Sequence, residues 1–345
     1  MAFEHADLST NSELGFGDRL NTNAMRPFVH NGRTYIVGNS GQPQLHSNTG
    51  LLMYDEWKDL DRRVVEVATG RLVGIADLQE RGLTHDLGSL GVTVAQWELS
   101  SDMTPADLSM SGVTAGEEDS QAFSQEDVPV PIIHKDFRIN LRRLEASRRM
   151  GESLDTMQAE TAARVVAERS EDMLFSGEPL KVEGKTIYGY LTHPHRNTAD
   201  LGTAWDQVDA ADNADIVEKV SAALQKARDD NHYGPFVIYV PGKYEFKLDE
   251  DYRDLDQRTV RQRIEQLAGV EAVRVSDRLS GDNVVIVEMS RRTTDIAIAQ
   301  DVATVQWSTQ GGMLEHFKVM AAWVPRVKAD FNGRSGIVHM KPENS

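Results

Sequence analysis

The chain has 345 residues, a formal net charge of −17 and no cysteine. The absence of cysteine excludes disulfides, thiolate zinc sites and cysteine nucleophiles. The acidity argues against general electrostatic binding to nucleic acid or to an anionic membrane. No apolar run approaches the roughly 18 residues of a membrane span, and the polar N-terminus does not have the pattern of a signal peptide, so we expect a cytoplasmic protein.

Residues 1–50 are rich in Asn, Gly, Ser and Thr, and Tyr35, Ile36 and Val37 form their one short strand-like patch. This composition predicts an extended arm with little core of its own. Whether the arm is ordered alone or only on a partner stays open at this point.

The stretch "LLMYDEWKDLDRRVVEVATG" predicts a helix that ends near Gly70. Its apolar residues recur at spacings of three and four: Met53, Trp57, Leu60, Val64 and Val67. Such a stripe packs against its own domain or docks against a partner. The following "RLVGIADLQERG" predicts a short second helix.

Two strand patterns follow, "VTVAQWEL" and "VPIIHKDFRINL", and we expect them to pair as one hairpin with a tip from about residue 100 to 127. An isolated two-stranded arm is at best marginally stable in water. We therefore expect a neighbouring subunit to hold it.

The charge along this region changes sign. Residues 82–134 contain no Lys or Arg, and their acids include Asp102, Asp107, Glu117, Glu118, Asp119, Glu126 and Asp127. Six basic residues follow within fifteen positions: Lys135, Arg138, Arg142, Arg143, Arg148 and Arg149. A solvated surface loop is one interpretation. The alternative that we favour is an acidic loop that reaches the basic segment of a neighbouring copy.

"ESLDTMQAETAARVVAERSEDMLFSG" predicts the longest helix, a spine capped at Ser153 and ended by Gly177. We expect its packed side to carry Leu154, Met157, Thr161 and Val165. Long C-terminal strands should pack on this spine through Trp307, Phe317 and Trp323.

Residues 205–300 have the pattern of a compact α/β unit, with helices at 214–230 and "RTVRQRIEQLAG" and strands at "PFVIYV", "EAVRVS", "NVVIVEM" and "DIAIAQ". Its acidic loop contains Asp249, Glu250, Asp251, Asp254 and Asp256. A solvated loop is the simpler interpretation. The alternative is a ring of such loops around a pore, where cations would offset the like charges.

The order of these elements resembles the major capsid proteins of tailed bacteriophages and the related encapsulin shells, which share the Hong Kong 97-type capsid fold. The resemblance rests on "LLMYDEWKDLDRRVVEVATGR", "VPVPIIHKDFRINLRRLEAS", "AERSEDMLFSG", "YGPFVIYVPGKYEFKLDEDY" and "NGRSGIVHM". It covers roughly residues 50 to 340.

The resemblance implies an α+β fold with an N-terminal arm, an extended loop hairpin, a peripheral domain with a long spine helix, and an axial α/β domain. The implied divisions are 1–50 (arm), 51–89 (N-terminal helices), 90–141 (extended loop), 142–204 (peripheral domain), 205–300 (axial domain) and 301–345 (peripheral β segment). It further implies a structural protein without cofactor or enzymatic activity. The chain would form pentamers, hexamers and an icosahedral shell, a virion capsid assembled in the host bacterial cytoplasm.

The partners implied are further copies of the chain, with scaffolding, portal and decoration proteins, and packaged double-stranded DNA without sequence-specific contact. The loop from 82 to 134 has no lysine, so we expect no lysine–asparagine cross-link there. The 50-residue arm and long loop tip favour a viral capsid. The alternative is an encapsulin compartment that encloses a cargo enzyme, with the stripe at Met53, Trp57, Leu60 and Val64 helping to form the docking surface for a cargo peptide.

One enzyme hypothesis remains, a metal-dependent hydrolase. "THPHRN" places His193 and His195 two residues apart, with Asp200 as a conceivable third ligand. No helix of the HExxH type supports it, and turn residues are the simpler interpretation.

Overall fold

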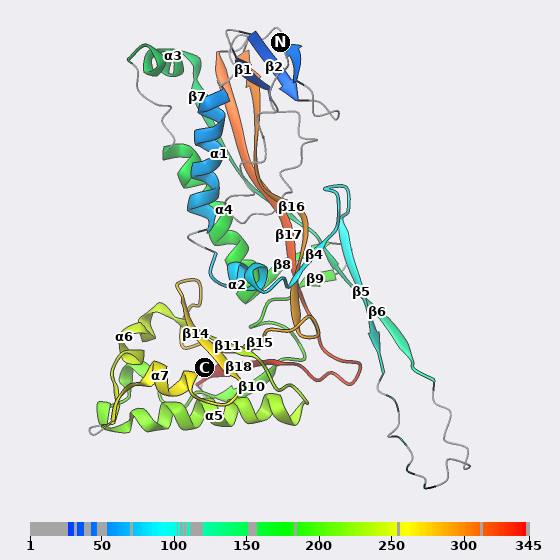
Figure 1. Cartoon of the computed structure of the whole chain (residues 1–345), viewed down its shortest axis with the longest axis vertical. Helices are drawn as coiled ribbons and strands as arrows, with labels where there is room; N and C mark the ends of the chain where they lie inside the picture. The colour runs from blue at the N-terminus through cyan, green and yellow to red at the C-terminus, as the bar shows by residue number, and fades with distance from the viewer. Residues whose placement is uncertain are drawn as a thin grey trace.

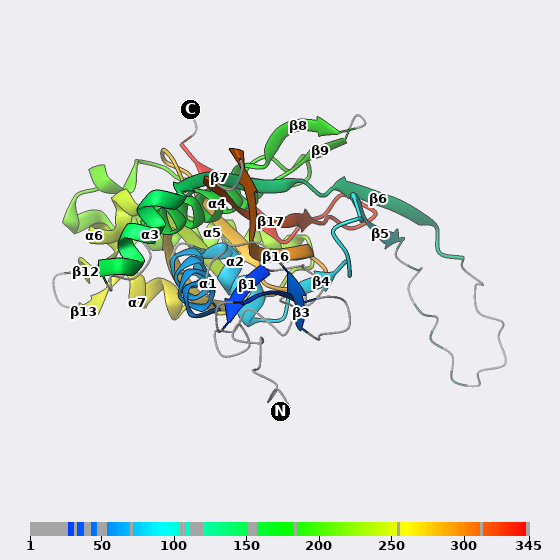
Figure 2. The same ribbon diagram turned by 90° about the horizontal axis from the view of Figure 1, so that it is seen from above.

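The computed structural model describes residues 27–30, 33–37, 43–46, 54–69, 72–101, 103, 106, 108, 110, 120–150, 157–182, 185–253, 256–310 and 313–342. The molecule is elongated: an α/β unit forms one end, a long helical and β-sheet unit rises from it, and a thin hairpin extends sideways (Figure 1). Figure 2 shows the hairpin extending well beyond the body.

The α/β unit is built on a five-stranded sheet with strand order β10-β18-β15-β11-β14. Its strands are β10 (Asn197–Asp200), β11 (Phe236–Pro241), β14 (Val270–Ser276), β15 (Val284–Glu288) and β18 (Ile337–Lys341). The central runs FVIYVP and VVIVE are buried at every position. Strands that are apolar on both faces need cover on both faces, and this sheet has it.

Helices cover one face of this sheet: α5 (Asn213–Asp229), α6 (Glu245–Leu248) and α7 (Val260–Glu265). Their core includes Phe236, Ile238 and Val240 of β11. The alternate residues Val237 and Tyr239 belong to the second core, with α2 (Gly74–Glu80) and α4 (Met157–Ser176). One sheet therefore joins the two cores of the molecule.

The second unit is a four-stranded sheet with order β4-β16-β17-β7. Its strands are β4 (Thr84–Asp86), β7 (Ile132–Asn140), β16 (Thr294–Thr309) and β17 (Leu314–Val327). Burial alternates along the first part of β17, with Phe317, Val319 and Ala321 buried and the residues between them half-buried. The buried face packs on α4 and on α1 (Tyr54–Thr69), so the predicted first helix and spine form one layer over this sheet.

The packed face of the spine helix is rotated relative to the prediction. The helix is described from Met157, ends before Gly177 with φ +72°, and the predicted cap Ser153 and Leu154 lie outside the described residues. Met157 and Val165 are 71% and 38% exposed, so that predicted face is wrong. The packed face instead carries Ala159, Ala162, Ala163, Val166 and Ala167. These small side chains allow close approach to α1 and β17.

Two of the three aromatic predictions for the C-terminal strands hold. Trp323 is buried and its Nε1 donates to Ser170 Oγ of the spine at 2.9 Å. Phe317 is buried in the same core, where it stacks on Phe137. Trp307 does not pack on the spine: it is 37% exposed and stacks on His316.

The predicted hairpin exists, but its second strand was assigned wrongly. β5 (Val94–Ser100) pairs with β6 (Phe123–Pro129), whereas β7 pairs with β17 of the body. Pro129 and Pro131 lack the N–H that a continuous ladder needs, and the chain changes partner there. Leu141, predicted to close that strand, begins the unpredicted helix α3 (Leu141–Met150).

Three small sheets complete the fold. β1 (Pro27–His30), β2 (Arg33–Val37) and β3 (Pro43–His46) form an antiparallel meander, in which β2 contains the predicted strand patch. The other two are the pairs β8 (Glu178–Val182) with β9 (Lys185–Ile187) and β12 (Asp251–Arg253) with β13 (Asp256–Thr259). Among the described residues, no helix is long and apolar enough to cross a membrane.

Candidate functional site

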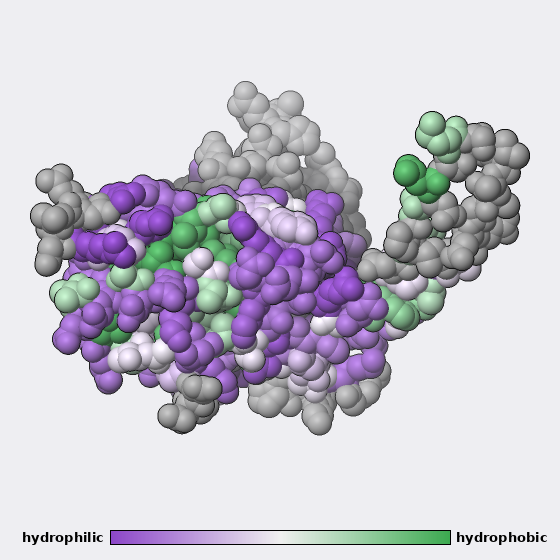
Figure 3. All heavy atoms as spheres, turned by 90° about the horizontal axis from the view of Figure 1, so that it is seen from below, coloured by the Kyte–Doolittle hydropathy of each residue, from purple (hydrophilic) through white to green (hydrophobic). Residues whose placement is uncertain are grey.

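The β5–β6 hairpin, called the arm from here on, projects from the body and is largely exposed beyond its root (Figure 2). The first four residues of β6 are exposed, and Phe123 among them is 68% exposed. At the tip, Leu108 and Met110 are completely exposed and Met103 is 59% exposed. Figure 3 shows apolar atoms gathered at this tip, away from the body. An apolar tip on a projecting arm is typical of a surface that another molecule covers.

The root of the arm is held rigidly. Arg326 donates two hydrogen bonds to Asp295 at 2.7 Å each, and Lys328 approaches the same carboxylate at 2.6 Å. Arg326 also donates to the Gln96 carbonyl oxygen of β5 at 3.3 Å and lies over the ring of Trp97. This buried cluster ties the arm to β16 and β17, so the exposed tip projects from a fixed base.

Two of the predicted acidic loop residues, Glu126 and Asp127, lie on the arm. Glu126 is exposed on β6, and Asp127 pairs with Lys185 of β9 at 2.5 Å. The other five predicted acids lie outside the described residues: Asp102, Asp107, Glu117, Glu118 and Asp119.

The predicted basic segment lies on the body. Lys135 and Arg138 are exposed on β7, and Arg142 and Arg143 are exposed on α3; the side chains of Arg148 and Arg149 lie outside the described part. In Figure 1 α3 lies at the end of the molecule opposite to the arm tip. The described members of the two charged sets therefore lie on different elements of one protomer, the acids on β6 and the basic residues on β7 and α3.

The open face of the four-stranded sheet brings Arg138 of the predicted basic segment beside residues that the sequence analysis did not assign to a site. The strand register places Trp307, His316 and Arg138 in one row across the sheet, and Val305, Lys318 and Asp136 in the next. Trp307 stacks on His316 with ring centroids 5.3 Å apart, and Lys318 lies over the Trp307 ring. This face, called the open sheet face, is partly apolar and carries basic groups. The alternation along β17 was the only sequence signal for it.

Basic side chains of the same chain pair with two acids of the predicted acidic loop of the α/β unit. Asp249 pairs with Arg261 at 3.3 Å, and Glu250 pairs with Lys247 at 2.6 Å. The hydrogen bond from Lys247 lowers the pKa of Glu250. Asp251 is exposed, and Asp254 and the side chain of Asp256 lie outside the described residues.

A groove lies beside this loop, between α5 and α7. Its walls include Val217 and Leu267, and Tyr252 stands at its edge beside Arg253 and Arg263. Figure 3 shows an apolar, hollowed patch on this side of the α/β unit.

Two residues of the predicted stripe on the first helix, Leu60 and Val64, are fully buried in the main core. They therefore contribute to packing and have no surface to offer a cargo peptide. Met53 and the side chain of Trp57 lie outside the described residues.

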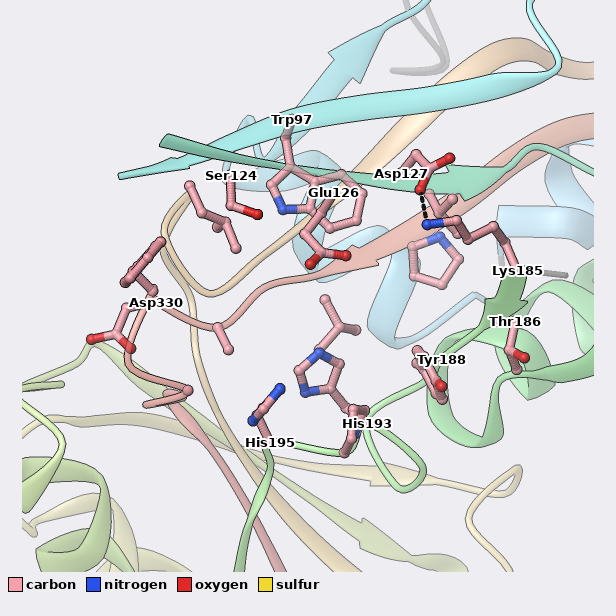
Figure 4. Close-up of a pocket in the computed structure, with 18 residues that line it drawn as sticks. Trp97, Ser124, Glu126, Asp127, Lys185, Thr186, Tyr188, His193, His195 and Asp330 are labelled. Carbon is pink, nitrogen blue, oxygen red and sulfur yellow. Dashed lines mark ion pairs between the residues drawn. The ribbon is translucent and has the colours of Figure 1, made fainter. Parts of the chain in front are cut away.

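The two predicted histidines line a pocket of about 450 Å³ under the root of the arm (Figure 4). In Figure 4 Trp97 and Glu126 come from the arm, while His193 and His195 face them from the loop after β9. His193 is 7% exposed, and burial, with the nearby His195 and Arg196, lowers its pKa to about 4.

These histidines do not form a three-ligand metal site. Asp200, the conceivable third ligand, pairs with Lys219 at 2.5 Å, and that hydrogen bond lowers its pKa. Within the described ranges, no group of three His, Cys, Asp or Glu side chains is placed to hold a metal ion. The structure thus gives the hydrolase hypothesis no ligand set.

Comparisons with known proteins agree with this geometry. Residues 47–340 match the model of a protein family described as a family of unknown function, DUF6260. The chain is 28% identical over 284 residues to the type 1 encapsulin shell protein EncA of Myxococcus xanthus (strain DK1622), covering 80% of this chain and 90% of that protein. It is 26% identical over 275 residues to a diheme-cytochrome-encapsulin shell fusion protein of Kuenenia stuttgartiensis, covering 79% of this chain and 70% of that protein.

Solved structures show the same architecture. The virus-like particle from Pyrococcus furiosus superposes with a TM-score of 0.60 at 16% identity, covering 83% of this chain and 99% of that chain. The capsid of Myoviridae phage XM1 gives a TM-score of 0.60 at 10% identity, covering 78% of this chain and 92% of that chain. The chain therefore belongs to the DUF6260 family and has the Hong Kong 97-type fold of phage capsids and encapsulin shells.

Proposed function

We propose that this chain is the structural subunit of a self-assembling icosahedral shell, built from pentamers and hexamers. The observation that carries the proposal is the complete Hong Kong 97-type fold together with a projecting arm that has an apolar tip. A soluble monomer would gain nothing from exposing Leu108, Met110 and Phe123. A shell subunit buries such groups against its neighbour.

In this proposal the arm of one subunit lies across the open sheet face and α3 of the next. Acids on the arm, such as Glu126, would meet Arg138 and Arg142, while the apolar tip would cover Trp307 and Val305. Each exposed ion pair contributes only about 0–1 kcal/mol, so the charges set register and the apolar burial supplies most of the affinity. Repetition over many copies makes a weak contact sufficient.

The sequence-derived division into an N-terminal arm, extended loop, peripheral domain and axial domain is part of the same proposal. The α/β unit would face the five- and six-fold axes, with the acidic loop at Asp249, Glu250 and Asp251 near the pore. Because Lys247 and Arg261 already offset two of these acids, divalent cations would have only a modest effect on the ring.

The shell's content separates two candidates. The first is a phage-type virion capsid, assembled in a bacterial cytoplasm around double-stranded DNA with scaffolding, portal and decoration proteins. The 50-residue N-terminal segment and the long tip of the β5–β6 hairpin support it. The second is an encapsulin compartment around a cargo enzyme, and the similarity to two encapsulin shell proteins supports it. In both, the chain acts without catalysis or cofactor.

The test is expression of the full chain alone, followed by size-exclusion chromatography with light scattering and by negative-stain microscopy. Closed particles or free pentamers and hexamers are expected. A stable monomer at high concentration would refute the shell proposal. Co-expression with the adjacent genes then separates the contents: dependence on a scaffold or portal gene indicates a capsid, and uptake of a neighbouring enzyme indicates an encapsulin.

A further inference from the structure

Helix α2 connects the two units of the molecule although it has only seven residues. Its N-terminus meets the spine helix α4, and its middle meets β11 and β14 of the α/β sheet. The residue before it, Val73, supplies no side-chain cap. The acceptors for its first N–H groups therefore come from elsewhere in the chain.

Glu171 of the spine supplies those acceptors. Its Oε1 accepts hydrogen bonds from the backbone N–H groups of Gly74 at 2.8 Å and Ile75 at 3.3 Å. The carboxyl is completely buried, and its Oε2 has no hydrogen-bond partner among the described residues. A Cβ at Gly74 would lie 2.7 Å from Leu174 and 3.3 Å from Glu171 Oε2, so only glycine allows this close approach.

Asp77 makes the second connection, from the same helix to the sheet. Its Oδ2 accepts the hydroxyl hydrogen of Tyr239 in β11 at 2.9 Å. Its Oδ1 accepts from Arg81 at 3.1 Å and lies 3.5 Å from Arg274 of β14. Asp77 thus has cationic partners, whereas Glu171 forms no ion pair with the part of the chain that the structure describes.

Among the titratable groups that face Glu171, Asp77 on α2 disfavours its ionised form through its charge. Tyr190 and Tyr239 also face it, but burial raises their pKa values and keeps them uncharged. Burial, followed by the charge of Asp77, raises the pKa of Glu171 to about 8, although the backbone N–H groups oppose this shift. The folded protein therefore holds a proton that an exposed glutamate would release near its usual pKa of about 4.3.

We propose that α2 is a pH-sensitive clasp between the spine helix and the α/β sheet, closed while Glu171 is protonated and opened as Glu171 ionises. Opening hydrates the Glu171 carboxylate and separates it from Asp77, at the cost of the Gly74 and Ile75 hydrogen bonds. Because α2 contacts both units, its release removes one connection between the spine helix and the sheet, while the direct hydrogen bonds from Arg278 to Asp172 of the spine, at 2.8 and 2.9 Å, remain. This inference concerns the single subunit and stands independently of shell formation.

The expected pH dependence follows from proton linkage. The closed clasp binds one proton that the open clasp releases, so the opening constant rises about tenfold for each pH unit between pH 6 and pH 8. Above the pKa of about 8 both states are ionised and the opening constant levels off.

Hydrogen exchange of the full-length wild-type chain, monitored by mass spectrometry over peptides that contain residues 72–81, tests this directly. After correction for the intrinsic effect of pH, exchange should accelerate about tenfold per pH unit from pH 6 to pH 8 and then flatten. The variant Glu171→Gln should show no such rise, since its amide keeps an acceptor for Gly74 but carries no proton to lose.

Glu315→Gln is the matched control. Glu315 is also a buried carboxyl, with its pKa raised by burial and one oxygen accepting from Gln306 at 2.8 Å, but it lies on β17 away from α2. This control should keep the wild-type rise at residues 72–81. Wild-type exchange that is independent of pH, or a rise that persists in Glu171→Gln, would overturn the proposal. The wild-type series decides the question even if a variant fails to fold.

Discussion

The arm and the centre of the α/β sheet are both antiparallel strand pairs of similar length, yet they are opposites in burial. β11 and β15 are buried at every residue, whereas β5 and β6 are mostly exposed beyond their root. The hydrogen-bond ladders are of the same kind, so the ladder does not decide which pair stabilises the fold. Apolar area removed from water does, at about 25 cal/mol per Å². The arm keeps its shape because its root is anchored. Its tip stays exposed and is available for contact with another molecule.

The largest expected effect tests that anchor. Asp295→Ala leaves Arg326 and Lys328 buried without their common carboxylate, and should lower the free energy of unfolding by about 3–5 kcal/mol. Denaturant unfolding measures it. Asp59→Ala, which removes an exposed ion pair to Arg62 of the same 2.7 Å length, is the control and should change stability by less than about 1 kcal/mol. Equal effects would show that the arm root is not a buried anchor.

The next prediction compares the two strand pairs themselves. Ile286→Ala in β15 creates a cavity in a fully buried position and should destabilise by about 2–5 kcal/mol. Leu108→Ser at the arm tip should change the free energy of unfolding by no more than about 0.5 kcal/mol, because the side chain is already exposed. The same arm variant should reduce particle formation. If it unfolds the subunit instead, the tip packs within its own chain.

A smaller effect is expected from low pH at the end of β15, the central strand of the α/β sheet. Glu288 is buried, which alone would raise its pKa, but hydrogen bonds from His232 at 2.5 Å and Thr293 at 2.6 Å lower it to about 2. The depressed pKa contributes stability that is present above pH 4.5 and is lost as pH falls toward 2. Glu288→Gln should cost about 1–3 kcal/mol at pH 7 and flatten the acid limb of a stability–pH curve. An unchanged acid limb would contradict the assignment.

The smallest effect concerns charge between subunits. Arg138→Glu on the open sheet face should leave the free energy of unfolding unchanged and raise the protein concentration needed for assembly, more at low salt than at high salt. Light scattering over a salt series measures this threshold. Lys58→Glu on α1 makes the same charge change elsewhere, and an equal shift there would mean that net charge alone is responsible.

The sequence predicted most local elements of the α/β unit, such as the helix at 214–230, observed as α5 with Ile216, Val220 and Leu224 buried. It was wrong about two strands: "DIAIAQ", assigned to this unit, lies in β16 of the four-stranded sheet, and β18, assigned to the peripheral segment, lies inside the α/β sheet. The spine face was wrong because alanine is a weak apolar signal, while the packing against α1 and β17 favours small side chains. The pairing of β7 with β17 was missed because it joins segments about 180 residues apart, and no local pattern encodes such a partner.

The candidate surfaces were predicted only in part. Charge patterning identified the arm and the basic segment, since both are contiguous in sequence. The open sheet face and the clasp were missed because each combines residues from distant strands and helices, as the row of Trp307, His316 and Arg138 illustrates. Burial raises the pKa of Glu171, and sequence alone does not show how a carboxyl is buried.

The position of β18 has a consequence for the timing of synthesis. This strand lies between β10 and β15, parallel to the first and antiparallel to the second, and it is the last strand described. On the ribosome, β10 has no partner in its sheet until residues 337–341 have emerged. The α/β unit therefore completes its sheet only after residue 341 has emerged from the ribosome.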